Sequence, residues 1–209
     1  MFANRTDAGR RLADMVRERG VEADVVLAVP RGGLPVGRAV ADELGIPLDI
    51  VAARKLGAPG NPELAIGAVS SDGTVWVNDA LVEDLGVSQG YIEDETVTER
   101  TAAAEKVETY RTGREPLDLH GKTALVVDDG VATGATTIAC LRQAYAAGAD
   151  RVVLAVPVGP PDTIERLRAE ADEVICVETP SQFRAVGQFY DSFTQVTDEE
   201  ARSYLESAE

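Results

Sequence analysis

The stretch 124–138, with the sequence ALVVDDGVATGATTI, constrains the fold more than any other part of the chain. It begins with an apolar run, 124–127, which is too short for a buried helix and whose valines favour a buried strand of a parallel sheet. Asp128 and Asp129 follow where the strand leaves the sheet, the edge at which open α/β sheets bind ligands. A helical pattern over about 136–147 comes next. The stretch therefore predicts an α/β fold with a ligand site beside the two aspartates.

Residues 130–137, which we call the threonine loop, join this strand to this helix. Glycines let backbone N–H groups approach an anion, threonines offer hydroxyl groups, and the helix start adds unpaired N–H groups with a positive dipole end. We therefore expect the loop to hold a phosphate. Asp128 and Asp129 would repel a phosphate, so we expect them to face sugar hydroxyls or a bound metal. A phosphate at one end and a diol at the other describe a ribose 5-phosphate.

A second anion site is expected at residues 30–33, Pro-Arg-Gly-Gly, which we call the arginine loop. The loop joins an apolar, β-branched strand over 25–29 to a helix that extends to Leu44. Arg31 stands at its centre, and Gly32 and Gly33 leave room for a large diphosphate. The alternative is an ordinary strand-to-helix turn, because Gly-Gly turns are common.

Arg54 and Lys55 are adjacent cations at the end of a strand expected over 48–53. The chain has only three lysines, and Lys55 is the one that we expect to bind the diphosphate. The alternative is a solvated basic pair. The following residues, 56–63, are rich in glycine and proline, which predicts a mobile loop.

The remaining patterns complete an alternation of strands and helices. Helices are expected over 6–19, 78–86, 88–111 and 161–169, a hairpin over 67–77, and further strands over 152–156 and 174–177. The helix 88–111 is highly charged with few apolar residues, so we expect a solvated face. A contact with a second copy in a homodimer is the alternative. The alternation of a strand with a helix, repeated about five times along the chain, predicts a parallel sheet of about five strands flanked by helices.

Composition excludes several classes of function. The net charge of −16 argues against nucleic acid as a partner, and so acidic a chain with so few lysines suggests adaptation to high salt. The N-terminal residues 1–19 are rich in charge, and no apolar run approaches a membrane span, so we expect a soluble, cytoplasmic protein. With one histidine, His120, and two cysteines, we expect neither a histidine metal cluster nor a disulfide.

The sequence VVDDGVATGATT at 126–137 resembles the phosphoribosyl pyrophosphate (PRPP) motif of type I phosphoribosyltransferases. The resemblance implies a Rossmann-like sheet in a single domain over 1–209, with a core over about 21–178. It also implies a hood built from the N-terminal segment and 179–209, and a flexible loop that closes over PRPP. Asp128 and Asp129 would hold the ribose hydroxyls and meet Mg²⁺ only indirectly, through PRPP. A cis peptide bond is expected between Pro30 and Arg31.

These motifs define the expected site residues. The 5-phosphate is expected at Ala132, Thr133, Gly134, Ala135, Thr136 and Thr137, and the diphosphate at Arg31, Gly32, Gly33, Arg54 and Lys55. The expected catalytic residues are Asp128, Asp129, Arg31 and Lys55. The cations would neutralise a departing diphosphate while the acids orient the ring beneath a developing positive charge, so that no covalent nucleophile is needed.

The acceptor side is expected in 178–191, where Phe183, Phe189 and Tyr190 are aromatic residues able to stack on a flat base. The alternative is that they seal a core. Ala132 stands where family members that act on 6-oxopurines carry an acid, so the motif is nearer to adenine-type or competence-protein-type members. We expect the phosphoribosyl group of PRPP to pass to a nitrogenous small-molecule acceptor, in nucleotide salvage, with release of pyrophosphate. The alternative is a PRPP-sensing regulator of the same fold without catalysis.

Overall fold

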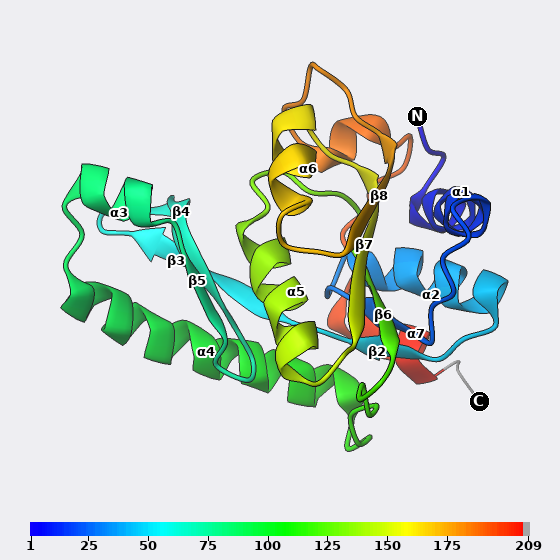
Figure 1. Cartoon of the computed structure of the whole chain (residues 1–209), viewed down its shortest axis with the longest axis horizontal. Helices are drawn as coiled ribbons and strands as arrows, with labels where there is room; N and C mark the ends of the chain where they lie inside the picture. The colour runs from blue at the N-terminus through cyan, green and yellow to red at the C-terminus, as the bar shows by residue number, and fades with distance from the viewer. Residues whose placement is uncertain (207–209) are drawn as a thin grey trace.

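The computed structural model describes residues 1–206 and is centred on a five-stranded parallel sheet (Figure 1). Its strands are β1 (Val25–Ala28), β2 (Leu48–Ile50), β6 (Thr123–Val127), β7 (Arg151–Val158) and β8 (Glu173–Glu178), in the order β2-β1-β6-β7-β8. The helices around it are α1 (Arg5–Glu18), α2 (Gly33–Leu44), α5 (Ala135–Ala146), α6 (Pro161–Leu167) and α7 (Asp198–Glu206). The predicted α/β class with a parallel sheet of about five strands is confirmed.

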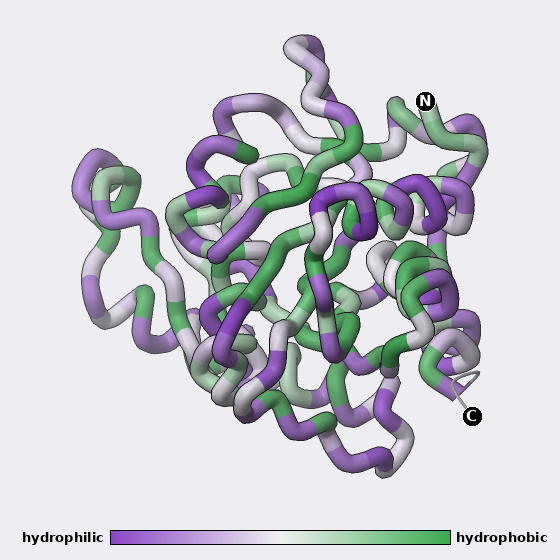
Figure 2. The backbone as a smooth tube through the Cα atoms, turned by 45° about the vertical axis from the view of Figure 1, so that its right-hand side comes forward, coloured by the Kyte–Doolittle hydropathy of each residue, from purple (hydrophilic) through white to green (hydrophobic). Residues whose placement is uncertain are grey.

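Both faces of this sheet are covered, because alternate residues of each strand enter different hydrophobic clusters. In β1, Val26 and Ala28 pack with residues of α1, α2 and α7, whereas Val25 and Leu27 pack with residues of α5 and α6. Figure 2 shows the strands at the centre as hydrophobic segments enclosed by more hydrophilic ones. Strands buried on two faces are apolar along their whole length, which is why short apolar runs in the sequence located them.

The strand order brings the ends of β1 and β6 together at the carboxyl edge of the sheet. The main-chain N–H of Val29 donates to the carbonyl of Val127 at 2.9 Å, directly after these two strands. The arginine loop continues from β1 and the threonine loop from β6, so the two predicted anion sites become neighbours. The chain leaves β1 toward one side of the sheet and β6 toward the other, and such a point of reversal is where open α/β sheets bind ligands.

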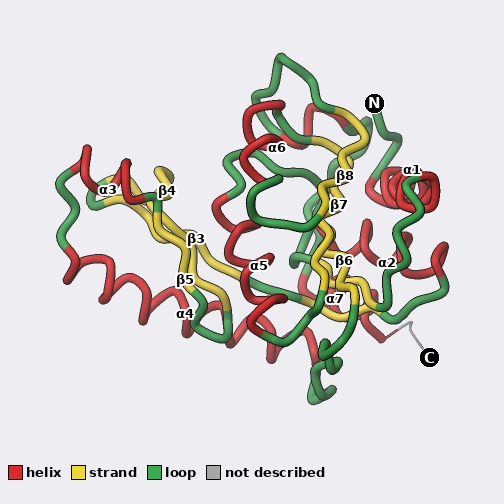
Figure 3. Tube along the Cα trace, in the orientation of Figure 1, coloured by secondary structure: helices red, strands yellow, loops and turns green. Residues whose placement is uncertain are grey.

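A second, antiparallel sheet forms what we call the arm, residues 53–111, which Figure 3 shows extending away from the five-stranded sheet. It consists of β3 (Ala53–Ala58), β4 (Asn61–Ser70), β5 (Val75–Val77), α3 (Asp79–Leu85) and α4 (Gln89–Arg111). Leu56, Ile66 and Ile92 are among the buried residues of its own small core. The hairpin predicted over 67–77 is confirmed as β4–β5.

Residues 56–63, predicted as a mobile loop, form a β-hairpin instead. Most of the segment belongs to β3 and β4, which pair with each other and reverse at Gly60, whose φ is +76°. Pro62 lies where the pairing is irregular, between the pairs Gly57–Ala65 and Ala58–Asn61, and a proline is tolerated at such a bulge. Packing of the hairpin on the arm's core thus overrides the local glycine and proline signal.

The helix predicted over 88–111 is present as α4, but its expected solvated face is only part of its surface. Ile92, Ala103, Val107 and Tyr110 are buried, the first within the arm and the last two against the main core. The apolar residues are sparse because α4 bridges two small contacts rather than lying along one continuous core. The helix therefore contacts both the arm and the main core, and some of its charged residues point toward the interior of the molecule.

The N-terminus and the segment after β8 pack together in the region predicted as the hood. Phe2 donates from its N–H to the carbonyl of Phe189 at 2.8 Å and accepts from Asp191 N–H at 2.9 Å. Phe189 ends a short 3₁₀ helix, η1 (Val186–Phe189). The predicted hood also includes 207–209, which lie outside the described residues. Within the described part of the chain, every helix is too short or too polar to cross a lipid bilayer.

Candidate active site

A cleft of about 730 Å³ lies between the carboxyl edge of the parallel sheet, the arm and the segment before α7. Its lining includes five cations and five carboxylates: Arg5, Arg31, Arg54, Lys55, Lys106, Glu63, Glu95, Glu99, Asp128 and Asp129. Thr136, in the first turn of α5, also lines it. The fold therefore brings together the acidic pair, the predicted cations and one end of the threonine loop, which are far apart in the sequence.

The acidic pair and the arginine loop lie in direct contact because the loop contains two glycines. A Cβ atom at Gly32 would overlap the carboxylate of Asp129, and one at Gly33 would lie 2.8 Å from the carbonyl oxygen of Val127. The Asp128 carboxylate accepts a hydrogen bond from the N–H of Asp129 at 2.8 Å. Any side chain at these glycines would push the arginine loop away from the acids.

Both carboxylates are held in a partly desolvated place while still lining the cleft. Burial raises the pKa of Asp128 well above its ordinary value, and the neighbouring charge of Asp129 raises it further. Burial also raises the pKa of Asp129, although the Arg5 guanidinium opposes this shift. Two adjacent acids in this setting favour a ligand that donates hydroxyl hydrogen bonds to the carboxylates or that carries a positive charge.

Arg5 is a site residue that the sequence reasoning missed. Its Nε donates to Asp129 Oδ2 at 2.8 Å, its Nη1 donates to the carbonyl of Thr194 at 2.7 Å, and its guanidinium lies 3.8 Å from the ring centre of Phe193. Its side chain is 11% exposed, so the ion pair is well shielded from water. An arginine at a helix start carries no sequence signal of this role, because its partners lie 124 and more residues away.

The threonine loop is held at Ala132 and Thr133 through their carbonyl groups, and at its start through one N–H group. Thr163 Oγ1 donates to the carbonyl of Ala132 at 2.8 Å, and Arg166 donates to the carbonyl of Thr133. Before them, the N–H of Val131 bonds to the carbonyl of Val158 at 2.9 Å. Fixing the carbonyls from α6 leaves the opposite, N–H side of the loop free to meet an anion.

The predicted phosphate residues differ in their exposure. Ala132 and Thr133 are exposed, Gly134 takes the left-handed conformation with φ +78°, and α5 begins at Ala135, whose first-turn N–H groups have no partner within the helix. Thr136 lines the cleft. Gly134, Ala135 and Thr137 are buried, so these positions can offer main-chain N–H groups at the start of α5 rather than exposed side chains.

The three predicted cations all line the cleft, and each is paired with a carboxylate. Arg31 contacts Asp198 at 3.4 Å, Arg54 contacts Glu99 at 2.7 Å, and Lys55 contacts Glu63 at 2.8 Å. The cis peptide bond predicted between Pro30 and Arg31 is confirmed. Because these pairs are largely solvent-exposed, each contributes little stability and exchanges readily for another anion.

A further cation, Lys106, was not expected from the sequence. It extends from α4 and donates from Nζ to the carbonyl of Pro30 at 2.9 Å, within the arginine loop. Burial lowers the pKa of Lys106, and the nearby charges of Arg54 and Arg31 lower it further. A sequence signal existed, since Lys106 is one of three lysines in the chain, but its helix reads as a surface helix.

The aromatic residues predicted for base binding do not line the cleft. Phe183 and Phe189 stack on each other with ring centres 5.4 Å apart, and Tyr190 is 6% exposed and donates to the carbonyl of Asp129 at 2.6 Å. Tyr190 belongs to the buried cluster that also holds Phe2, and Phe183 and Phe189 pack against this cluster while partly buried. The aromatic residue that does line the cleft is Phe193.

The site fits a magnesium ion that is held mainly by its substrate. Among residues 1–206, no three metal-ligating side chains gather into a cage of their own. Asp128 and Asp129 instead offer two adjacent carboxylates beside the threonine loop, where a phosphate is expected. Mg²⁺ in proteins is usually bound through one or two carboxylates together with substrate phosphates and waters, which matches this donor set.

An open parallel sheet with a glycine-containing loop, a helix N-terminus and acids at one edge is the arrangement of α/β proteins that bind phosphorylated small molecules. The chain belongs to the phosphoribosyl transferase family, because the family model of the phosphoribosyl transferase domain matches residues 3–193.

Similar proteins agree with this assignment. The chain is 44% identical over 208 residues to a Mycobacterium tuberculosis protein provisionally named a phosphoribosyl transferase, and the match covers 100% of this chain and 47% of that protein. The chain thus spans about half the length of the curated relatives that it matches. The crystal structure of TT1426 from Thermus thermophilus superposes with a TM-score of 0.86 at 42% identity, covering 100% of this chain and 99% of the other. The AQ2163 protein of Aquifex aeolicus, at 11% identity, shares the fold with a TM-score of 0.54 and covers 88% and 78% of the two chains.

Proposed function

We propose that this chain transfers the 5-phosphoribosyl group of PRPP to a nitrogenous acceptor with release of pyrophosphate. The family assignment supports a transferase of this class. The observation that carries the proposal is that three groups meet at one edge of the sheet: the threonine loop, the pair Asp128 and Asp129, and what we call the cationic wall. The cationic wall consists of Arg31, Arg54 and Lys55. These three parts match the three parts of PRPP: a 5-phosphate, a ribose diol and a diphosphate.

The threonine loop and the acidic pair position the sugar. The N–H groups of residues 132–136 receive the 5-phosphate, with the helix dipole of α5 behind them. Asp128 and Asp129 accept hydrogen bonds from the ribose hydroxyls, and their charge stabilises the positive charge that develops on the ring. The ion pair with Arg5 holds one carboxylate oxygen of Asp129 in place, and Asp129 still lines the cleft.

The cationic wall stabilises the departing diphosphate. Arg31 and Lys55 bind the oxygens of the diphosphate. Arg54, the neighbour of Lys55 on β3, adds a further positive charge. When bound with PRPP, Mg²⁺ supplies additional neutralisation of the charge on the diphosphate. Each protein cation has to exchange its carboxylate partner for a phosphate oxygen, which costs little because these ion pairs are solvent-exposed.

The acceptor is proposed to enter beside Phe193 rather than beside the three aromatics named from the sequence. Phe193 is 37% exposed and lies under Arg5, which reaches Asp129 and therefore the sugar site. Gln195 lines the same part of the cleft and offers both a donor and an acceptor to a flat heterocycle.

Release of pyrophosphate from PRPP and Mg²⁺ with a panel of nucleobases tests this function. We expect release that depends on one or a few acceptors, together with formation of the matching nucleoside 5′-monophosphate. Saturable PRPP binding without release on any acceptor would support the PRPP-sensing regulator instead. Absence of PRPP binding would contradict both.

A further inference from the structure

Lys106 differs from the other cations of the cleft in its partner. Arg5, Arg31, Arg54 and Lys55 each contact a carboxylate. Among residues 1–206, no carboxylate lies within ion-pair distance of Lys106, whose Nζ contacts the neutral carbonyl of Pro30 at 2.9 Å. An ammonium group has three donors, so two remain for a ligand.

The surroundings of Lys106 concentrate positive charge. Arg54 and Arg31 lie close enough to disfavour its charged form, and the lysine is itself largely desolvated. Asp128 opposes this repulsion, but from beyond ion-pair distance. Arg31 and Arg54 have carboxylate partners, so the repulsion that a bound anion would relieve falls mainly on Lys106.

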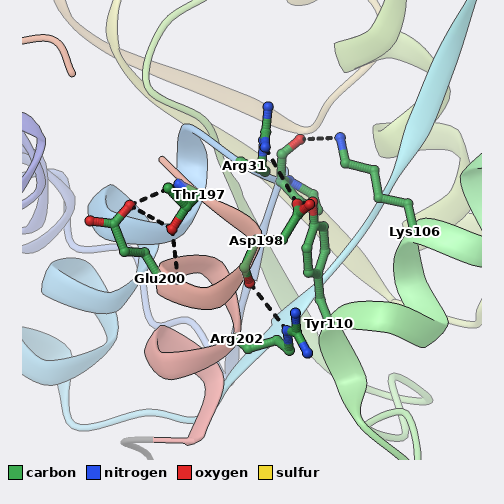
Figure 4. A network of polar contacts seen from close by, with 8 residues as sticks. Arg31, Lys106, Tyr110, Thr197, Asp198, Glu200 and Arg202 are labelled. Atoms are coloured by element: carbon green, nitrogen blue, oxygen red, sulfur yellow. Dashed lines mark hydrogen bonds and ion pairs between the residues drawn. The ribbon is translucent and has the colours of Figure 1, made fainter. Parts of the chain in front are cut away.

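A second contact from the same helix shows what α4 contributes to the arginine loop. Tyr110, four residues after Lys106 and so on the same face of α4, donates to Asp198 Oδ1 at 2.5 Å, and the same oxygen lies 3.4 Å from Arg31 Nη1. Figure 4 shows Lys106 and Arg31 near each other, with Asp198 and Tyr110 below them. The Arg31 side chain is thus positioned by Asp198 of α7, whereas Lys106 contacts the main chain of the arginine loop.

We propose that Lys106 is a diphosphate-binding residue, delivered from α4 to complete a three-cation site with Arg31 and Arg54. The inference rests on the proposed function, which supplies the diphosphate. In the ligand-bound state, the free donors of Lys106 contact phosphate oxygens while its bond to Pro30 keeps the arginine loop in register. The long charged helix therefore contributes to the substrate site with its inward face, while its outer face is solvated.

The binding of magnesium pyrophosphate, measured by calorimetry, tests this role. Lys106→Gln removes the charge but keeps an amide donor for the Pro30 carbonyl, so it separates anion binding from loop support. We expect at least about tenfold weaker binding, because a charge-assisted hydrogen bond is lost. Lys106→Arg should stay within about threefold of wild type, and Lys122→Gln, which removes a lysine remote from the cleft, should be unchanged.

Two results would overturn the assignment in distinguishable ways. Unchanged affinity in Lys106→Gln would reject the role of Lys106 and leave the proposed function standing. A wild-type protein that binds neither pyrophosphate nor PRPP would reject both.

A measurement on the wild-type chain covers the case in which the variants fail to fold. Acetylation of the lysines, followed by mass spectrometry, should be at least about fivefold slower at Lys106 when pyrophosphate is present. Lys122 serves as the internal control and should react at the same rate. Equal rates at Lys106 with and without saturating pyrophosphate would contradict the proposal.

Discussion

The threonine loop and the arginine loop have the same local design and are held in different ways. Both are strand-to-helix turns with glycines at the carboxyl edge of neighbouring strands. The threonine loop has its carbonyls fixed by Thr163 and Arg166 and offers main-chain N–H groups. The arginine loop offers a side chain, and Lys106 and Asp198 reach it from helices 76 and 167 residues away in sequence.

The two loops differ in which parts of the chain supply their ligand-binding groups. A site made of main-chain N–H groups is complete once its own loop and helix have formed. A site made of side chains depends on the packing of the arm and of α7 on the sheet. Substitutions near the arginine loop should therefore have larger effects on ligand binding than substitutions that support the threonine loop.

The largest effect is expected from Gly32→Ala. The added methyl group overlaps the Asp129 carboxylate and displaces the arginine loop from the acidic pair. A shift of about 1 Å in a catalytic group can cost roughly a hundredfold, so we expect kcat/KM for PRPP to fall by about that factor or more. The matched control is Gly90→Ala, at a helical position where a Cβ atom meets nothing within 4 Å. Equal kcat/KM values in the two variants would show that the close approach has no functional role.

Asp129→Asn should lower turnover by roughly tenfold to a hundredfold, because a charged hydrogen-bond acceptor for the sugar is lost. The melting temperature should change much less. The variant loses an ion pair, which is destabilising, but it also loses a partly desolvated charge, which is stabilising, and the two effects offset each other. The comparison of kcat with the thermal melting curve decides the matter. A loss of turnover no larger than expected from unfolded protein would make Asp129 a structural residue.

Asp128→Asn is expected to stabilise the ligand-free protein at neutral pH, by an increase in Tm of about 3 °C. Burial raises the folded-state pKa of Asp128 above its ordinary value of 3.8. Wild-type stability is therefore fully present below that ordinary pKa and is lost as pH rises through the raised one. The gain in Tm should be close to zero near pH 3.5, grow as pH rises and level off above the folded-state pKa. A gain that is constant with pH would contradict this cause.

The smallest effect is expected from Thr163→Val, which removes the hydroxyl that holds the Ala132 carbonyl. One neutral hydrogen bond contributes about 1 kcal/mol, so affinity for ribose 5-phosphate should fall by about fivefold or less. The bond between Val131 and Val158 keeps the loop in place. A loss as large as that in Gly32→Ala would remove the distinction between the two loops.

The sequence was sufficient for the parts of the site that are local. The acids after β6, the glycines of both loops and the alternation of strands with helices followed from short patterns, because each pattern is completed within its own segment. The order of the strands in the sheet came only from the structure. Arg5, Lys106 and Phe193 were missed because their partners are distant in sequence and are joined only by tertiary packing. Tyr190 shows the same limit, since the sequence places it near the ligand edge and packing against Phe2 buries it.

Titration of the ¹⁵N-labelled protein with ribose 5-phosphate tests the central claim most directly. The largest amide shifts are expected at Thr133, Gly134, Ala135 and Thr136, and 2-deoxyribose 5-phosphate should bind about tenfold more weakly because Asp128 and Asp129 lose a hydroxyl partner. Shifts confined to another surface, such as the pocket formed by 181–184 and Gln188, or equal affinity for the two sugars, would contradict the account.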